Sequence, residues 1–179
     1  QDAIALNAKH LKEMAAERIR DEFVRVIMSP RPHIGLILSQ KLGLLKYIVP
    51  ELEEGIGMAQ NKAHSFDVFE HTLRTIEHAA KKEFPLETRL SALFHDIGKP
   101  ATRRWSDEKK DWTFYGHDVV GAKIAAKIMA RLAFPKKMTE PVTTLVRWHM
   151  FFSDTEKIPH SAVRRIVNRV GKEHIWRLM

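Results

Sequence analysis

The dipeptide His95-Asp96 places an imidazole beside a carboxylate within the stretch Leu93–Pro100. Nitrogen and carboxylate oxygen together form a donor set suited to Mn, Fe, Co, Ni or Zn, and Mg also uses carboxylates. Neighbouring side chains on a regular helix point about 100° apart, so this pair would converge on one ion most easily where a helix unwinds. Lys99 adds a cation suited to phosphate. Taken alone, however, the pair favours a simple surface hydrogen bond.

Apolar residues precede this pair at helical spacing and predict a helix over about 86–96. They are Leu86, Leu90, Leu93, Phe94 and Ile97. Gly98 suits the C′ position just beyond the helix, and Pro100 is expected to stop its continuation.

Further candidate ligands lie at or near the ends of other predicted helices. His71 falls on a helix expected over about 68–83, with Asp67 as its N-cap. Gly116 opens a helix to about 132 with His117 in its first turn, where free backbone N–H groups favour an anion. Helical bundles build metal sites from side chains on facing helices. The candidate metal ligands are therefore His71, His95, Asp96, His117, His149 and Asp154.

The remaining pattern predicts an all-α protein. Helices are expected over about 3–28, 33–42, 44–54, 139–151 and 160–170, and Pro50 should kink the third or end it early. The polar, aromatic segment 103–115 is compatible with a loop or a small hairpin around residues 107–110. No strand alternation of useful length and no repeat is found.

Length and composition exclude several classes of protein. A chain of 179 residues holds one domain, or one domain with a small helical extension. The absence of cysteine excludes disulfides and thiolate metal sites, and it fits a reducing compartment. No apolar run reaches transmembrane length and no signal-peptide pattern is present. We therefore expect a cytoplasmic protein without a membrane partner. Because the chain starts at Gln1 and stops inside an apolar helical pattern, we expect a fragment of a longer protein.

The formal net charge of +8 is unevenly distributed. Residues 1–60 carry eight basic and eight acidic side chains, whereas residues 131–179 carry ten basic and four acidic ones. This bias favours a polyanionic partner, with nucleic acid ahead of a membrane surface. Arg164 and Arg165 lie on the expected basic helix 160–170 and are candidate RNA contacts. The alternative is a solvated basic face without a partner.

The order of these motifs resembles the HD-domain superfamily of metal-dependent phosphohydrolases. The resemblance is closer still to the C-terminal half of bacterial tRNA nucleotidyltransferases and poly(A) polymerases, and it covers nearly the whole chain. It rests on His71, 95–99, His117 and His149, and on the segments 17–22, 43–52, 67–73, 114–122 and 145–151.

This resemblance implies an HD-type helical bundle over residues 61–179, preceded by a neck-like, RNA-binding segment over residues 1–60. Arg18 and Arg20 would contact RNA or a nucleotidyltransferase head. The sequence contains no strand-borne Asp-x-Asp pair and no glycine-rich nucleotide-binding strand, so nucleotide addition is not expected from these residues alone. Expected partners are tRNA or another RNA, and a homodimer is compatible with the family.

The resemblance also assigns roles within the candidate site. His71, His95 and Asp96 would hold a first divalent ion, joined by Asp154 or by an acidic residue beyond Met179. His117 and His149 would hold a second ion or orient the phosphate.

Asp96 and Lys99 are the expected catalytic residues. Lys99, together with Arg103 or Arg104, would bind the phosphate of a small phosphate ester or a cyclic nucleotide.

Two alternatives to a phosphohydrolase domain remain open at this point. One is a non-catalytic, RNA-binding and dimerising tail whose HD site is idle, and the other is a free-standing HD nucleotidase. The neck-like helices disfavour the second alternative.

Overall fold

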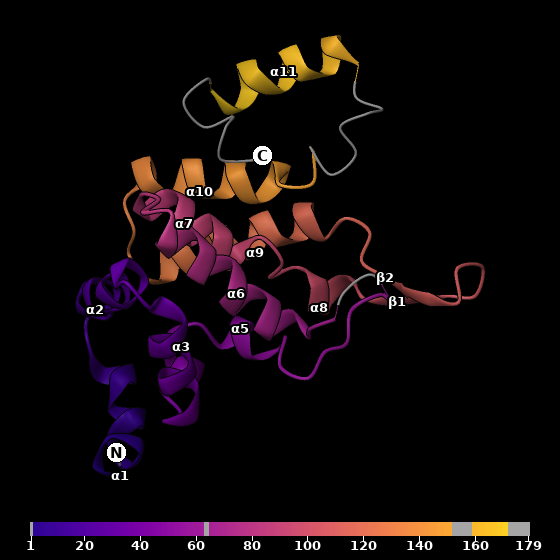
Figure 1. The fold of residues 1–179 in the computed structure, drawn as a ribbon. Helices are drawn as coiled ribbons and strands as arrows, with labels where there is room; N and C mark the ends of the chain where they lie inside the picture. The colour runs from indigo at the N-terminus through magenta and orange to yellow at the C-terminus, as the bar shows by residue number, and fades with distance from the viewer. Residues whose placement is uncertain (1, 63–64, 152–158, 172–179) are drawn as a thin grey trace.

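The N-terminal part of the chain is a series of short helices rather than one long helix. The computed structural model describes residues 2–62, 65–151 and 159–171 (Figure 1). The expected helix over 3–28 is divided into α1 (Asp2–Asn7), the 3-10 helix η1 (Ala8–Glu13) and α2 (Ala16–Met28). The prediction of one helix is wrong because Met14 and Ala15 adopt extended backbone conformations. This break lets Leu11 and Ile19 line the same apolar groove.

The next helices follow the expected pattern closely. They are α3 (Pro32–Lys41), α4 (Leu45–Ile48), α5 (Pro50–Glu53) and α6 (Val68–Lys81). The expected effect of Pro50 is confirmed, since α4 ends before it and α5 begins with it. The expected N-cap of α6 is also confirmed, because Oδ1 of Asp67 accepts a hydrogen bond from the Glu70 amide at 2.6 Å.

The chain around Gly98 connects two helices, α7 (Leu86–Phe94) and α8 (Lys99–Thr102). Pro100 does not stop the chain from becoming helical again, because it occupies the first turn of α8, where no backbone N–H is needed. Gly98 is not a left-handed C′ residue, since its φ is −83°. Glycine is required there for a different reason. A Cβ atom would lie 2.2 Å from the carbonyl oxygen of His117 and 2.6 Å from the amide nitrogen of Gly121.

A small antiparallel hairpin follows α8 and consists of β1 (Arg104–Ser106) and β2 (Asp111–Thr113). In its register Trp105 lies opposite Trp112. Of the two possibilities left open for segment 103–115, the hairpin is the one observed. It projects to one side of the helices (Figure 1).

Three further helices complete the described fold. They are α9 (His117–Arg131), α10 (Lys136–Trp148) and α11 (His160–Val170). Helix α10 begins three residues earlier than expected, because the carbonyl of Pro135 accepts the amide hydrogens of Met138 and Thr139. The all-α prediction is confirmed, with the hairpin as the exception among the described residues.

One hydrophobic core joins the N-terminal helices to the later ones. It runs from Phe23 and Ile27 on α2 through Ile76, Leu93 and Phe94 to residues of α9 and α10. Helix α11 packs on α10 through a smaller cluster of Leu145, Ile166 and Val170. Within the described ranges, no helix is both long and apolar enough to cross a membrane.

Arg89 links the N-terminal helices to α7 within this core. Its guanidinium is buried and donates to the carbonyl oxygens of Ile27, Ser29 and Phe84 at 3.1, 3.0 and 2.9 Å. These bonds satisfy carbonyls at the end of α2 and before α7. They therefore tie the end of α2 to the helix that leads into His95.

Candidate metal centre

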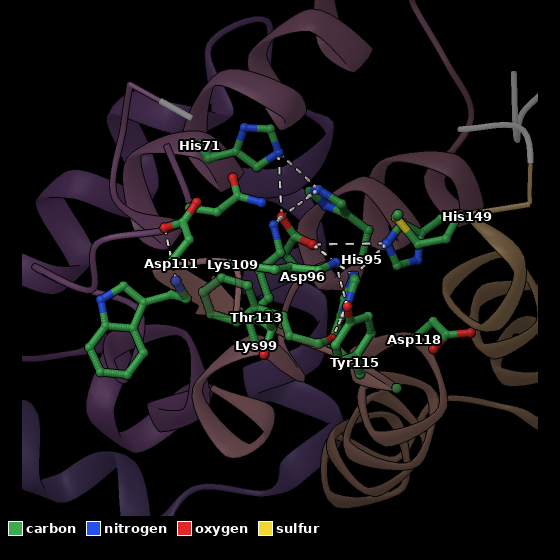
Figure 2. Close-up of a pocket in the computed structure, with 16 residues that line it drawn as sticks. His71, His95, Asp96, Lys99, Lys109, Asp111, Thr113, Tyr115, Asp118 and His149 are labelled. Atoms are coloured by element: carbon green, nitrogen blue, oxygen red, sulfur yellow. Dashed lines mark hydrogen bonds and ion pairs between the residues drawn. The ribbon is translucent and has the colours of Figure 1, made fainter. Parts of the chain in front are cut away.

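The candidate ligands gather in a cavity of about 690 Å³ (Figure 2). His71 comes from the first turn of α6, His95 and Asp96 from the turn after α7, His117 from the start of α9, and His149 from the end of α10. Five of the six candidate ligands are thus brought together from four helix ends. The sixth, Asp154, lies outside the described residues.

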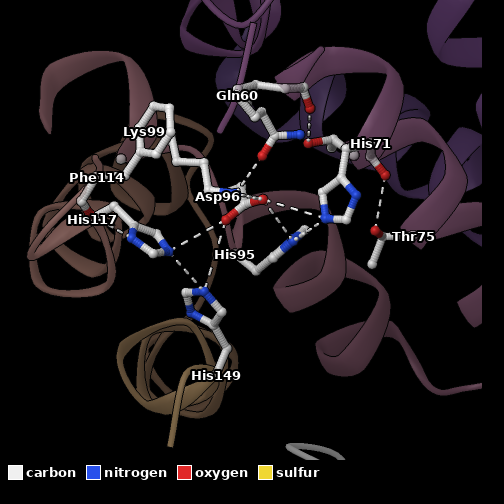
Figure 3. A network of polar contacts seen from close by, with 12 residues as sticks. Gln60, His71, Thr75, His95, Asp96, Lys99, Phe114, His117 and His149 are labelled. Carbon is white, nitrogen blue, oxygen red and sulfur yellow. Dashed lines mark hydrogen bonds and ion pairs between the residues drawn. The ribbon is translucent and has the colours of Figure 1, made fainter. Parts of the chain in front are cut away.

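Asp96 lies at the centre of the group, with only 2% of its surface exposed. Its Oδ2 is 3.1 Å from Nε2 of His95 and 3.4 Å from Nε2 of His71. Its Oδ1 is 3.4 Å from Nε2 of His117 and 3.9 Å from Nε2 of His149. Figure 3 shows the carboxylate between the two pairs of imidazoles. One carboxylate can therefore serve two sets of three ligands.

Local backbone carbonyls orient three of the four imidazoles. Nδ1 of His95, His117 and His149 lies 2.8, 2.8 and 2.7 Å from the carbonyl oxygen three residues earlier in each case. A carbonyl only accepts, so each Nδ1 must carry a proton, and in the neutral imidazole each Nε2 then presents a lone pair to the cavity. This is the tautomer that binds a metal ion through Nε2.

The spacing of the lone pairs fits a bound cation. Nε2 of His71 is 3.1 Å from Nε2 of His95, and Nε2 of His117 is also 3.1 Å from Nε2 of His149. Two facing lone pairs repel unless a proton or metal ion lies near both. Two nitrogens bound at about 2.1 Å and at right angles to one ion lie about 3 Å apart. The residues present therefore fit a divalent ion in either set.

Electrostatic interactions keep Asp96 ionised and His149 neutral, as such an ion requires, whereas they favour a proton on His95, which an ion would have to displace. Burial opposes ionisation of Asp96, but His95, His117 and Lys99 outweigh it and hold the pKa of this carboxyl well below its usual range. Burial, supported by repulsion from His95, lowers the pKa of His149 to about 4. Burial also disfavours charge on His95, but the attraction of Asp96 outweighs it and raises the pKa of that imidazole.

Lys99 lies behind Asp96 rather than in open solvent. Only 6% of its surface is exposed, and its Nζ donates to Oδ2 of Asp96 at 2.7 Å and to Oε1 of Gln60 at 2.6 Å. Gln60 is itself held by the carbonyl of Phe66, to which its Nε2 donates at 3.0 Å. Sequence reasoning missed Gln60, because nothing distinguishes it from the other polar residues of the loop before α6.

A second ion pair holds the helix ends that carry His117 and His149. Arg147 donates to Oδ2 of Asp118, which joins the end of α10 to the first turn of α9. Each member of this pair lies within two residues of a candidate ligand. Asp118 also lines the cavity. Neither residue stood out in the sequence, because the pairing depends on the packing of α9 against α10.

The predicted phosphate- and RNA-binding arginines lie elsewhere. Arg103 and Arg104 are not among the residues lining the cavity, and the guanidinium of Arg103 stacks 3.6 Å from the Trp112 ring centre. Arg20 donates to the carbonyl of Ala133 at 2.5 Å, so it joins α2 to the connection between α9 and α10. The other predicted RNA contacts, Arg18, Arg164 and Arg165, are exposed.

Known families match this architecture in two parts. A family model described as an HD domain matches residues 64–173. The chain belongs to the HD-domain family. A second model, described as a probable RNA and SrmB-binding site of polymerase A, matches residues 1–56. The family predicted from the sequence is confirmed.

Similar proteins include several tRNA nucleotidyltransferases. The CC-adding tRNA nucleotidyltransferase of Thermus thermophilus is 45% identical over 138 residues, which are 76% of this chain and 32% of that protein. The A-adding tRNA nucleotidyltransferase of Deinococcus radiodurans is 36% identical, over 84% of this chain and 35% of that protein. A multifunctional CCA protein of Neisseria meningitidis is 29% identical, over 87% of this chain and 37% of that protein. The HD-domain chain thus spans about a third of the length of these relatives.

Proposed function

We propose that this HD domain is a metal-dependent phosphohydrolase acting on small phosphate esters, including cyclic nucleotides. The observation that carries the proposal is the sharing of Asp96 between two histidine pairs whose Nε2 atoms lie 3.1 Å apart. Such a set of nitrogen and oxygen donors suits a divalent transition metal. The proposal places this activity in residues 61–179 and an RNA-binding, neck-like segment in residues 1–60.

The chain offers two places for an ion. His71, His95 and Oδ2 of Asp96 would hold one, and His117, His149 and Oδ1 of Asp96 would hold another. A divalent ion supplies, when bound, a water of lowered pKa and draws negative charge from phosphate oxygens.

Lys99 contributes to the same chemistry in two ways. An ammonium group has three donors, and Asp96 and Gln60 take two of them. The third is available to a phosphate oxygen, since Lys99 lines the cavity. In addition, the positive charge keeps Asp96 ionised and directed at the imidazoles. Nucleotide addition is not proposed for residues 1–179.

Hydrolysis by the metal-depleted and reloaded protein tests this proposal. We expect cleavage of bis(p-nitrophenyl) phosphate and of 2′,3′-cyclic nucleotides to return with Mn, Ni or Co, and to fall at least about a hundredfold in His95→Ala. His78→Ala is the matched control, because His78 is exposed on α6. Equal activity of the His95 and His78 variants would assign the hydrolysis to a contaminant. Absence of hydrolysis with every metal would leave the idle-site alternative.

We further propose that the neck-like segment binds the phosphate backbone of RNA. Lys9, Lys41 and Lys46 line a cavity of about 450 Å³, and Tyr47 lies beneath Lys46 and Lys12, with ammonium-to-ring distances of 5.2 and 5.5 Å. Residues 3–12 and 23–50 contain no Asp or Glu. Residues 1–60 have no net charge, but these lysines lie in stretches that contain no acidic residue, and they form a basic surface. Its position within the matched RNA-binding region supports an RNA partner.

The salt dependence of RNA binding tests this surface. Each lost phosphate contact should reduce the slope of log K against log salt by about one. We expect Lys41→Ala with Lys46→Ala to flatten the slope for a tRNA-like hairpin, and Lys123→Ala with Lys127→Ala on α9 to leave it unchanged. If the Lys41 and Lys46 double variant keeps the slope unchanged, while the double variant Arg164→Ala and Arg165→Ala flattens it, the RNA-binding surface lies on α11 instead.

A further inference from the structure

The metal cavity has a second lysine at its exposed edge. Among the described residues that line the cavity, the Lys and Arg side chains are Lys99 and Lys109. Lys99 is buried and bound to Asp96 and Gln60. Lys109 is exposed in the turn between β1 and β2, and it forms no salt bridge within the described residues. Its charge is therefore available to an anion that enters the cavity.

A hydrogen bond holds the Lys109 side chain in place. Its Nζ donates to the hydroxyl of Tyr115 at 2.6 Å and lies 5.2 Å from the centre of that ring. Both residues line the cavity (Figure 2). The tyrosine hydroxyl is a neutral partner, so the bond positions the ammonium group without neutralising it. Two of the three ammonium donors remain for a ligand.

Tyr115 belongs to the turn that leads into His117. The carbonyl oxygen of Phe114 accepts from the backbone amide of His117 at 3.1 Å, and Nδ1 of the same histidine lies 2.8 Å from it. The first bond closes a four-residue turn. Gly116, with φ of 75° and ψ of 10°, has the left-handed conformation that a type II turn requires at its third position. The Lys109 ammonium is thus bound to the turn that orients a candidate metal ligand.

We infer that Lys109 binds a phosphate group of the substrate at the edge of the metal cavity, and that Tyr115 positions it. This inference rests on the proposed hydrolysis at the metal centre. Phosphate oxygens accept charge-assisted hydrogen bonds from an ammonium group. Lys109 takes the role predicted for Arg103 or Arg104, which do not line the cavity. The bound phosphate is either the one that is hydrolysed or a second phosphate of the same nucleotide.

Lys109→Met tests the inference, and Lys110→Met is the matched control. Lys110 is the next residue of the same turn, is also exposed, pairs with Asp107 at 3.8 Å and does not line the cavity. We expect KM to rise about tenfold in Lys109→Met with kcat within about twofold, because the contact is made in the bound substrate and in the transition state alike. Tyr115→Phe should raise KM by a smaller factor, since it releases the ammonium group without removing it. Co(II) binding should stay unchanged in all three variants.

Three substrates identify the phosphate that Lys109 binds. Bis(p-nitrophenyl) phosphate and adenosine 2′,3′-cyclic phosphate contain one phosphate, whereas the 5′-phosphorylated form of the second compound contains two. A higher KM of Lys109→Met for all three assigns the lysine to the hydrolysed phosphate. A higher KM for the third compound alone assigns it to the second phosphate.

Two results would overturn the inference. One is an equal KM of Lys109→Met and Lys110→Met for every substrate, and the other is a loss of Co(II) binding in Lys109→Met, which would make the lysine structural. If no substrate is hydrolysed, the proposed function fails, and calorimetric titration with adenosine 3′,5′-bisphosphate decides the inference separately. Binding that weakens about tenfold in Lys109→Met but not in Lys110→Met supports it. No binding, or equal binding by both variants, overturns it.

Discussion

The metal-ligand cluster and the lysine cluster on the N-terminal helices represent opposite ways of building a charged site. Asp96 and its four imidazoles are partly or fully buried, and hydrogen bonds to backbone orient at least three of the rings. Lys9, Lys12, Lys41 and Lys46 are exposed and form no ion pair within the described residues. The first site requires its ligand atoms to be positioned to within a few tenths of an ångström, whereas the second depends only on the total charge of its lysines. A single misplaced atom should therefore damage the first site and leave the second largely intact.

The largest effect is expected from Gly98→Ala. The new Cβ would meet backbone atoms of α9 at 2.2 and 2.6 Å, and backbone cannot move aside without shifting His117. We expect a loss of more than about 3 kcal/mol in the free energy of unfolding, measured by chemical denaturation. Gly57→Ala is the control, since its Cβ would meet nothing within 4 Å and the φ of +68° should cost only about 1–2 kcal/mol. Equal losses would show that the close approach of Gly98 to α9 does not constrain the site.

Arg89→Met tests the connection between the two regions. Removing the guanidinium leaves the buried carbonyl of Ile27 and the partly buried carbonyls of Ser29 and Phe84 without this donor. We expect unfolding to become easier by about 3 kcal/mol. Arg104→Met, on the exposed hairpin strand, should change stability by less than about 0.5 kcal/mol. A small effect at Arg89 would mean that its hydrogen bonds contribute little to holding α2 against α7.

The pH dependence of stability should reveal the buried, neutral state of His149. Its folded pKa of about 4 lies below the unfolded value of about 6.5, so between these values the unfolded chain binds the extra proton. The metal-free protein should therefore lose stability relative to His149→Gln as the pH falls from 6.5 to 4.5, by about 2 kcal/mol. Urea unfolding of both proteins in a chelator measures the difference. If the free energy of unfolding of both proteins varies with pH in the same way, His149 is not buried in its neutral form.

The smallest effect on stability is expected from the lysine cluster. Lys41→Ala and Lys46→Ala remove exposed side chains without ion pairs in the described structure, so the free energy of unfolding should change by less than about 0.5 kcal/mol. Thermal unfolding at low and high salt measures this. A loss above about 1 kcal/mol would make these lysines structural and would remove the contrast between the two regions.

Sequence reasoning found the parts of the site that depend on residue type, and it missed those that depend on close approach. His71, His117 and His149 were candidates because each lies near a predicted helix end, and the helices do bring them to Asp96. Gln60 lies in a loop whose position is set by tertiary packing, so no local pattern marks it. For the same reason, nothing in the sequence of residues 17–22 indicates the bond from Arg20 to the carbonyl of Ala133.

A titration of the metal-free protein with Co(II), followed by visible absorption and calorimetry, tests the central claim most directly. We expect one or two ions per chain, with a spectrum that shows nitrogen ligands, and loss of binding in Asp96→Ala, because Asp96 serves both sets of ligands. His78→Ala should bind as the unmodified protein does. Absence of Co(II), Mn and Ni binding, or unchanged binding in Asp96→Ala, would contradict the assignment of this cluster as a metal centre.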